Sequence, residues 1–282
     1  MAESKKRTLG LITDFGLKGS LYVGMMKAVI TRINPRVNIV DISHQITPFS
    51  IIEAGYVLKT SYPYFPEESI FIVVVDPGVG SSREILLVKS KSNHYFIVPN
   101  NGILPIVLDQ DEMIECINVL NKQYFVKPVS NTFHGRDIFS PIAAHLSLGV
   151  PINKFGTTYN KKNIMKTSKN YFVNVEESMF KCSIQFIDSF GNLVTNISIR
   201  DNKIEDFPLK LNEGDKFTFI NKNKEYVGKF STHFGEVALN ELLFLQGSTG
   251  YLEISLNQGN AAKNIGLNSG DELVIKLIRD DF

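Results

Sequence analysis

The sequence has very few cysteines, and the two that it has lie far apart. Cys116 and Cys182 form no CxxC pair and have no histidine at the spacing of a metal site. This spacing argues against a disulfide framework and against the common kinds of zinc site. We interpret both thiols as buried groups of a protein from a reducing compartment.

Long apolar runs and an excess of one charge are lacking as well. No stretch approaches the ~20 apolar residues that span a bilayer, and no apolar segment follows the basic cluster near the N-terminus, as it would in a secretory signal. Thirty basic side chains stand against 29 acidic ones, which leaves a formal net charge of +1. Such a balance gives no field that attracts nucleic acid or a membrane. We expect a soluble cytoplasmic protein with neither partner.

Several familiar catalytic motifs are also missing. There is no GxSxG elbow, no catalytic Cys–His pairing and no P-loop ending in GK[ST]. The DFG at 14–16 resembles the kinase motif, but the other kinase motifs do not accompany it. His44 and His233 are interpreted as histidines without an acidic partner nearby. We find no metal-ligand spacing and predict that no metal is bound.

The first half of the chain alternates short apolar runs with segments of helical periodicity, which is typical of an α/β domain with a largely parallel sheet. Runs without polar alternation, such as FIVVV, suit strands that are covered on both faces. The expected strands are 9–13, 37–42, 70–75, 85–89 and 95–98, and the expected helices are 22–33, 51–61 and 137–148.

The second half has a different texture. Residues 153–170 are polar and fit a linker, and the short strands beyond them predict a smaller all-β, barrel-like domain. We therefore expect an N-terminal domain at 1–165 and a C-terminal domain at 166–282. The expected strands of the second domain are 180–187, 193–199, 216–221, 225–230, 251–256 and 272–278.

Polar residues gather where the expected strands of the first domain end. Ligands of α/β proteins bind beyond the carboxyl ends of the strands, so four such loops predict a site there. The FHGRD segment at 133–137 also packs His, Arg and Asp together, but taken alone it is better explained by a helix cap by Asp137 beside an ordinary loop histidine, His134. The four strand-end motifs are TDFG at 13–16, DISH at 41–44, DPGVG at 76–80 and PNNG at 99–102.

Two stretches of the second half combine an aromatic residue, amides and glycine turns. They are IDSFGNLVTNI at 187–197 and GSTGYLEIS at 247–255, the latter followed by QGNA at 258–261. A purine needs an aromatic surface for stacking and hydrogen-bonding groups for its edge, and both stretches could supply them. A pair of ordinary β-turns is the alternative interpretation.

Taken together, these motifs resemble one family, the S-adenosylmethionine hydroxide adenosyltransferases, which are relatives of the bacterial fluorinase and chlorinase. Seven elements appear in order between residue 9 and about residue 278: ITDFG, DISHQITPF, FIVVVDPGVGSSR, VPNNG, TFHGRD, IDSFGNLVTNI and GSTGYLEISLNQGNAA. The resemblance implies an α/β domain joined to a β-barrel and assembled as a homotrimer. The substrate would lie between the N-terminal domain of one subunit and the C-terminal domain of its neighbour.

The resemblance also implies which residues bind the small-molecule substrate, S-adenosylmethionine, with no further cofactor. Asp14 would hold the ribose hydroxyls, and Phe49 would line the methionine end of the pocket. Phe190 would stack on adenine. The remaining substrate-binding positions are Asp188 and Asn192 near the methionine amino and carboxylate groups or the ribose, Ser248 at the methionine carboxylate, Tyr251, and the backbone around Asn257 at the adenine edge.

The hydrolases of this family differ from the halogenases by a catalytic triad that falls here on Asp76, Arg83 and His134. The fluorinase has a tyrosine at the position of Asp76, and a serine that helps to hold the halide at the position of Gly135. We therefore expect hydrolysis of S-adenosylmethionine to adenosine and methionine by an activated water that attacks C5′. A halogenase and a non-catalytic sensor of S-adenosylmethionine or adenosine are the alternatives. The choice of base between Asp76 and His134 stays open.

The chain departs from the family pattern at one place. Relatives have an acid shortly after TDFG, in a TDFG-x-x-D pattern, whereas this chain has LKGSLY at 17–22 with an extra residue. Any contact that this acid makes in relatives is not expected here.

Overall fold

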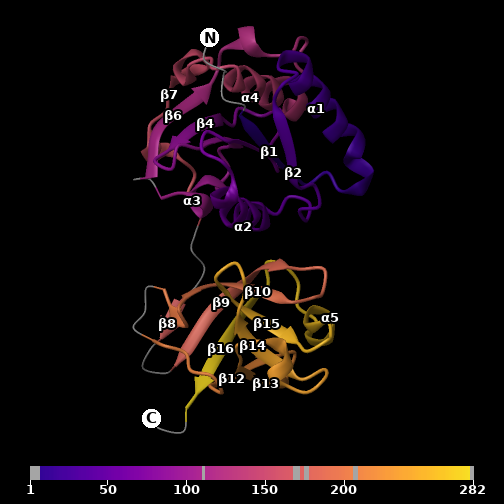
Figure 1. Cartoon of the computed structure of the whole chain (residues 1–282), viewed down its shortest axis with the longest axis vertical. Coiled ribbons are helices and arrows are strands. Elements are labelled where there is room, and N and C mark those ends of the chain that lie inside the picture. Colours follow the sequence, from indigo (N-terminus) through magenta and orange to yellow (C-terminus); the bar gives the residue numbers. More distant parts are fainter. Residues whose placement is uncertain (1–6, 110–111, 168–171, 175–177, 206–208, 280–282) are drawn as a thin grey trace. The chain divides into compact units, whose positions relative to one another are not determined.

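The structure is a computed structural model, and it describes residues 7–109, 112–167, 172–174, 178–205 and 209–279. The chain divides into two compact units, Met1–Thr167 and Ser168–Phe282. Each unit has buried hydrophobic clusters of its own. Figure 1 shows the helices and strands of both units.

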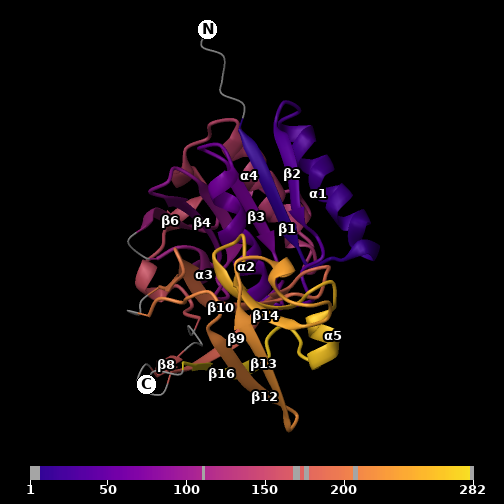
Figure 2. The ribbon, with the colours of Figure 1, turned by 60° about the horizontal axis from the view of Figure 1, so that its bottom comes forward.

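The first unit is built on a seven-stranded sheet with the order β2-β1-β3-β5-β4-β6-β7. The pairs β1–β2, β1–β3 and β3–β5 are parallel, and the other three pairs are antiparallel. In Figure 2, β2, β1 and β3 lie side by side. The strands are β1 (Thr8–Thr13), β2 (Asn38–Ser43), β3 (Ile70–Val74), β4 (Ile85–Ser90), β5 (Tyr95–Pro99), β6 (Met113–Val119) and β7 (Gly156–Thr158).

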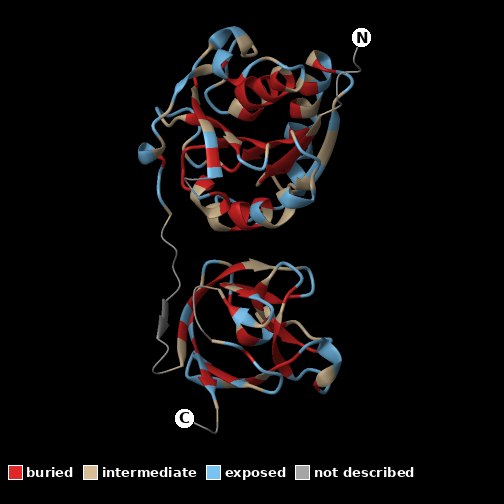
Figure 3. Cartoon of the chain, turned by 60° about the vertical axis from the view of Figure 1, so that its left-hand side comes forward, coloured by how far each residue is buried: buried red, intermediate tan, exposed pale blue. Residues whose placement is uncertain are grey.

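Helices cover both faces of this sheet. Side chains of α1 (Ser20–Ile33) and α4 (Ser140–Ser147) share one hydrophobic cluster with the strands, and those of α2 (Ile51–Ser61) and α3 (Leu104–Val107) share the other. Figure 1 shows the same three layers. Because both faces are covered, β3 and β5 are buried along their whole length, as the unbroken apolar run of β3 predicts (Figure 3).

The second unit is a barrel. Its strands pair in the order β10-β15-β14-β13-β12-β16-β9, and pairing between β9 and β10 closes the ring of seven. Two further short strands extend the sheet, and phenylalanine and aliphatic side chains fill the core. The elements are β8 (Phe172–Asn174), β9 (Met179–Ile187), β10 (Leu193–Arg200), β11 (Lys203–Ile204), β12 (Lys216–Asn221), β13 (Lys224–Phe230), β14 (Leu242–Gln246), β15 (Tyr251–Leu256), α5 (Ala261–Ile265) and β16 (Glu272–Ile278).

The expected fold class is confirmed: the first unit is α/β and the second is an all-β barrel. The interpretation of 153–170 as a linker is wrong for part of that range, because β7 pairs there with β6 and the side chain of Ile164 is buried. β7 consists of Gly and Thr at the sheet edge, so its pairing depends on backbone groups and leaves no apolar pattern. Residues 168–170 lie outside the described residues.

Candidate active site

Two of the predicted site residues, Asp14 and Asp76, lie at the same edge of the sheet. β1 and β3 are parallel neighbours with Thr13 opposite Val74, so Asp14 and, after Val75, Asp76 lie at the carboxyl ends of adjacent strands. This is the edge at which α/β proteins bind ligands.

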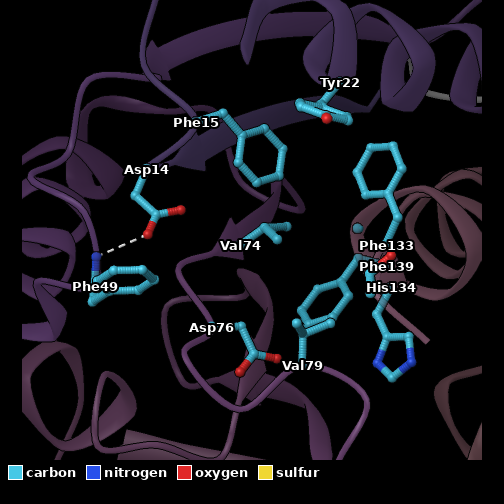
Figure 4. A pocket seen from close by; sticks show the side chains of 12 residues that line it. Asp14, Phe15, Tyr22, Phe49, Val74, Asp76, Val79, Phe133, His134 and Phe139 are labelled. Carbon is cyan, nitrogen blue, oxygen red and sulfur yellow. Dashed lines mark hydrogen bonds between the residues drawn. The ribbon is translucent and has the colours of Figure 1, made fainter. Parts of the chain in front are cut away.

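A cavity of about 330 Å³ lies at this edge. Four of the expected residues line it, namely Asp14, Phe49, Asp76 and His134. Figure 4 shows Asp14 and Phe49 next to each other, with Asp76 and His134 farther along the wall. The remaining lining residues are Phe15, Tyr22, Val74, Val79, Thr132, Phe133, Gly135 and Phe139.

Asp76 forms a buried ion pair with Arg83. A guanidinium nitrogen of Arg83 contacts Oδ1 of Asp76, and the side chains of Arg83 and Asp76 are only 16% and 6% exposed. Gly78 lies against this contact, and a Cβ there would lie 2.6 Å from the Arg83 guanidinium, which would have to shift. The positive charge favours the ionised form of Asp76. Arg83 is not among the residues that line the cavity.

His134 lies at the start of a π-helical turn, Gly135–Phe139, that leads into α4. Burial lowers its pKa below the ordinary value of 6.5; Asp137 acts in the opposite direction, and the charge of Arg83 lowers the pKa further. The imidazole is therefore neutral at pH 7. Since Arg83 pairs with Asp76 and also acts on His134, the three predicted catalytic residues form one electrostatic group.

Asp137 does not cap a helix. Its fully buried carboxylate accepts hydrogen bonds from Arg136 and from the backbone N–H of Ser130. Burial raises the pKa of Asp137, but the bonds from Arg136 and Ser130 outweigh it and the net pKa is lowered. The interpretation of Asp137 as a helix cap is therefore wrong. This carboxylate instead ties the loop before His134 to the turn after it.

Asp14 joins the loops that follow β1 and β2. Its Oδ2 accepts a hydrogen bond from the backbone N–H of Phe49 at 2.9 Å (Figure 4). Phe49 has a positive φ of 68°, which is uncommon for a residue with a side chain, and its ring is 68% exposed. The bond holds Phe49 in this conformation at the cavity wall.

The expectation that His44 and His233 lack an acidic partner is wrong. Nε2 of His44 lies 3.0 Å from Oδ1 of Asp41, and Nε2 of His233 lies 3.4 Å from Oε1 of Glu236. Nδ1 of His44 lies 3.0 Å from the hydroxyl of Thr13. His44 therefore braces the end of β1 against the end of β2, beside Asp14.

Sequence reasoning missed the aromatic side of the cavity. Phe15, Tyr22 and Phe133 form a triangle of edge-to-face contacts with ring centroids 5.3–6.0 Å apart. Phe15 and Phe133 belong to the TDFG and FHGRD motifs, so the motifs contained a signal for two of the three rings. The rings give this part of the wall an apolar surface.

Three predicted residues of the second unit lie together on the turn between β9 and β10. Oδ1 of Asp188 accepts hydrogen bonds from the backbone N–H groups of Phe190 and Asn192, and Oδ2 accepts one from Nδ2 of Asn192. This network holds the turn between β9 and β10 and leaves the Phe190 ring 75% exposed. Asp188, Phe190 and Asn192 therefore lie together, as expected from their motif.

The other three predicted residues of this unit lie on β15 or at its ends. Ser248 is on the exposed turn before the strand, and Tyr251 is buried at its start. Asn257 follows its end, where its Nδ2 donates to the Val237 carbonyl and its backbone N–H donates to Glu241. Sequence reasoning missed Glu253 between them, whose pKa is raised to about 7 by burial and by the nearby charge of Asp188.

Two findings concern ligands and membranes. Among the described residues, no three His, Cys, Asp or Glu side chains gather in a group that could hold a metal ion. No helix in the described part of the chain has the length and apolar character that crossing a membrane requires.

Comparison with known families finds matches in both halves. Residues 9–156 match the N-terminal domain of the SAM hydroxide adenosyltransferases, and residues 182–274 match the C-terminal domain. A relative from Methanocaldococcus jannaschii, named (R)-S-adenosyl-L-methionine hydrolase, is 33% identical over 94% of each chain. A protein of the same name from Thermus thermophilus is 30% identical over 94% of this chain and 97% of its own. A fluorinase from an Actinoplanes species is 27% identical over 64% of this chain and 68% of its own.

Among solved structures, an uncharacterized conserved protein from Thermotoga maritima has a TM-score of 0.85 and 38% identity. The match covers 95% of this chain and 99% of that one.

Proposed function

We propose that this chain, which belongs to the SAM hydroxide adenosyltransferase family, hydrolyses S-adenosyl-L-methionine to adenosine and L-methionine. The observation that carries the proposal is the buried Asp76–Arg83 ion pair, whose carboxylate lines the same cavity as His134 and Asp14. A carboxylate at this place suits an enzyme that activates water and would repel a halide ion.

The reaction is a displacement at C5′. A water oxygen forms a bond to C5′ while the C5′–S bond breaks, and the electron pair stays on sulfur, so methionine leaves as a neutral thioether. The water loses one proton, which Asp76 or the neutral His134 accepts and passes to solvent. Arg83 keeps Asp76 ionised, and positioned general bases of this kind contribute about 10²–10⁴-fold in rate. The apolar wall from Val74, Val79 and Phe133 limits the entry of bulk water.

Substrate binding is divided between the two sequence domains, 1–165 and 166–282. In the first, Oδ1 of Asp14 faces the ribose hydroxyls while Oδ2 holds Phe49, which lines the methionine end. In the second, Phe190 stacks on adenine, a role that its exposed ring on a braced turn supports. The other residues of the second domain in this proposal are Asp188, Asn192, Ser248, Tyr251 and Asn257.

Family resemblance extends the proposal to a homotrimer in the cytoplasm, with S-adenosylmethionine as the small-molecule partner and without a metal or another cofactor. Each half of the binding set then comes from a different subunit. Sedimentation of the purified protein at several concentrations measures the number of chains, and a stable monomer with full activity would contradict this part of the proposal.

The test of the function is product analysis. The purified protein is incubated with each sulfonium epimer of S-adenosyl-L-methionine, because relatives are named for the (R) form, in buffers with and without chloride. We expect adenosine and methionine in equal amounts, with no 5′-chloro-5′-deoxyadenosine. A chlorinated product would establish a halogenase. Tight binding without products, unchanged in Asp76→Ala, would establish a sensor.

A further inference from the structure

The PNNG motif at the end of β5 has no part in the proposed function, yet two of its side chains are buried. Asn100 is 6% exposed and Asn101 is 8% exposed, and neither lines the cavity. A buried amide needs hydrogen-bond partners, so the position of these partners shows what the two side chains hold.

The sheet order puts these asparagines under the loop that carries Asp76 and Arg83. β5 lies between β3 and β4 in the sheet, although it follows both in the sequence. The connection from β3 to β4 therefore has to pass over the end of β5, where Asn100 and Asn101 are located. This connection comprises residues 75–84.

Asn101 holds the first residue of that connection. Its Nδ2 donates a hydrogen bond of 2.8 Å to the backbone carbonyl of Val75, the residue directly before Asp76. Its Oδ1 accepts from the backbone N–H of Ile103, which fixes the orientation of the amide. This contact therefore fixes the backbone that leads into Asp76.

Asn100 holds the other end. Its backbone N–H donates to the Glu84 carbonyl at 2.9 Å, and its Nδ2 donates to a Glu84 carboxylate oxygen at 3.2 Å. Its Oδ1 accepts from the backbone N–H of Met165. Glu84 directly follows Arg83, and its charge acts against the lowering of the Arg83 pKa by burial. Asn100 thus fixes both the backbone and the charge next to Arg83.

We propose that Asn100 and Asn101 are positioning residues, which hold the two ends of the 75–84 loop so that Asp76 stays paired with Arg83 and directed into the cavity. Between these ends the loop contains Gly78 and Gly80, and its internal backbone bonds are two short turns, from Val79 to Asp76 and from Ser81 to Gly78. The inference rests on the proposed function, because it assigns Asp76 and Arg83 to the reaction. Neither asparagine lines the cavity, so both act through the loop.

The test compares Asn101→Ala with Asn34→Ala. Asn34 is a matched control in the same unit, because it is 7% exposed, its Nδ2 donates to Ser147 and its Oδ1 accepts from Arg36. We expect Asn101→Ala to lower kcat about 10- to 100-fold with KM within about 2-fold, since a misplaced catalytic group costs rate. Asn34→Ala should lose comparable thermal stability and keep the wild-type kcat.

A second pair of variants covers the case in which Asn101→Ala does not fold. Glu84 is half-buried, and Glu84→Ala removes the carboxylate acceptor of the Asn100 amide, which also donates to the Tyr159 hydroxyl, whereas Glu84→Gln keeps an amide oxygen in its place. We expect kcat to fall about 5- to 20-fold in Glu84→Ala, because the loop no longer holds the catalytic groups in place. In Glu84→Gln, kcat should stay close to the wild-type value. Equal losses in the two variants would contradict the proposal.

A double variant shows whether Asn101 acts through Asp76. In an Asp76→Asn background, adding Asn101→Ala should change kcat by less than about 2-fold, because residues that act as a unit are not additive. Full additivity would overturn the inference, as would a wild-type kcat in Asn101→Ala.

If the wild-type protein forms no adenosine, the proposed function fails instead. A crystal structure of Asn101→Ala then decides the positioning claim, since an unmoved Asp76–Arg83 pair would overturn it.

Discussion

The two units present their predicted site residues in opposite ways. In the first unit, the Asp76 side chain is 6% exposed and is held by Arg83, which comes from the far end of the same loop. In the second unit, Phe190 is 75% exposed, and the hydrogen bonds that hold its turn join residues no more than four positions apart. Both carboxylates also accept local backbone hydrogen bonds, Asp76 from Gly78 and Asp188 from Phe190, but only Asp76 has a buried cationic partner.

This difference indicates a division of labour. Charge pairs act more strongly when they are removed from water, so a buried carboxylate with a fixed partner suits the chemical step. An exposed aromatic ring on a braced turn suits recognition of a flat ligand. Substitution of Asp76 should therefore affect kcat, whereas substitution of Phe190 should affect KM.

The largest effect is expected for Asp76→Asn. We expect kcat to fall about 10³-fold with little change in KM, because the variant keeps the shape of the side chain and loses its charge. Steady-state assays of adenosine release measure both constants. Glu68→Gln is the control, since it breaks another arginine–carboxylate pair of the same unit, with Arg7. A loss of kcat in Glu68→Gln as large as that in Asp76→Asn would show that the effect is not specific to Asp76.

The next effect concerns the second unit. Phe190→Ala should raise KM about 10-fold and leave kcat within about 2-fold, since an aromatic contact contributes roughly 1 kcal/mol beyond the buried area. Phe234→Ala is the control, because Phe234 is another aromatic side chain of this unit, 39% exposed and outside the proposed site. If Phe190→Ala lowered kcat instead, the second unit would take part in the chemical step and not only in recognition.

A smaller effect is expected in the pH dependence of kcat. Burial lowers the pKa of His134, so its neutral form persists as the pH falls below 6.5. If neutral His134 contacts the water, activity is lost only as the pH falls through this lowered pKa, and the acid limb lies below 6.5. This acid limb should be absent from the pH profile of the residual activity of His134→Asn. It should stay in His94→Gln, which removes another histidine whose pKa burial lowers. An acid limb above the ordinary histidine value of 6.5 would exclude this role.

The smallest effect concerns the stability of the second unit. Burial and Asp188 raise the pKa of Glu253 from 4.5 to about 7. The folded state therefore binds more protons than the unfolded state between these pH values, and stability declines as the pH rises through that window. Glu253→Gln should raise Tm by about 3 °C at pH 8 and by much less at pH 5. The exposed Glu213→Gln should give no such difference, and an equal gain at both pH values in Glu253→Gln would contradict the account.

The residues at the strand ends were the part of the site that the sequence pattern predicted best. TDFG and DPGVG each follow a buried apolar run, so the pattern of apolar runs and polar loops is enough to place Asp14 and Asp76 at one edge of the sheet. Arg83 could be added only through the family resemblance, because its pairing with Asp76 depends on the course of the 75–84 loop, which turns twice between the two residues.

Other features of the structure have no clear local pattern in the sequence. The sequence pattern did not single out β6 and β14 as strands, and β7 carries no apolar side chain because it is an edge strand. Glu253 looks like an ordinary outward residue of β15, and its raised pKa comes from burial and from Asp188, which is distant in the sequence. The contacts of Asn100 and Asn101 depend on β5 lying between β3 and β4, a sheet order that local periodicity does not contain.

The most direct test of the central claim is a single-turnover reaction in ¹⁸O-labelled water with the protein in excess over S-adenosylmethionine. If Asp76 activates water in the cavity of the first unit, the adenosine of the first turnover carries one ¹⁸O atom at its 5′ position. Unlabelled adenosine would contradict the account, because the oxygen would then come from a carboxylate of the protein that attacks C5′ itself.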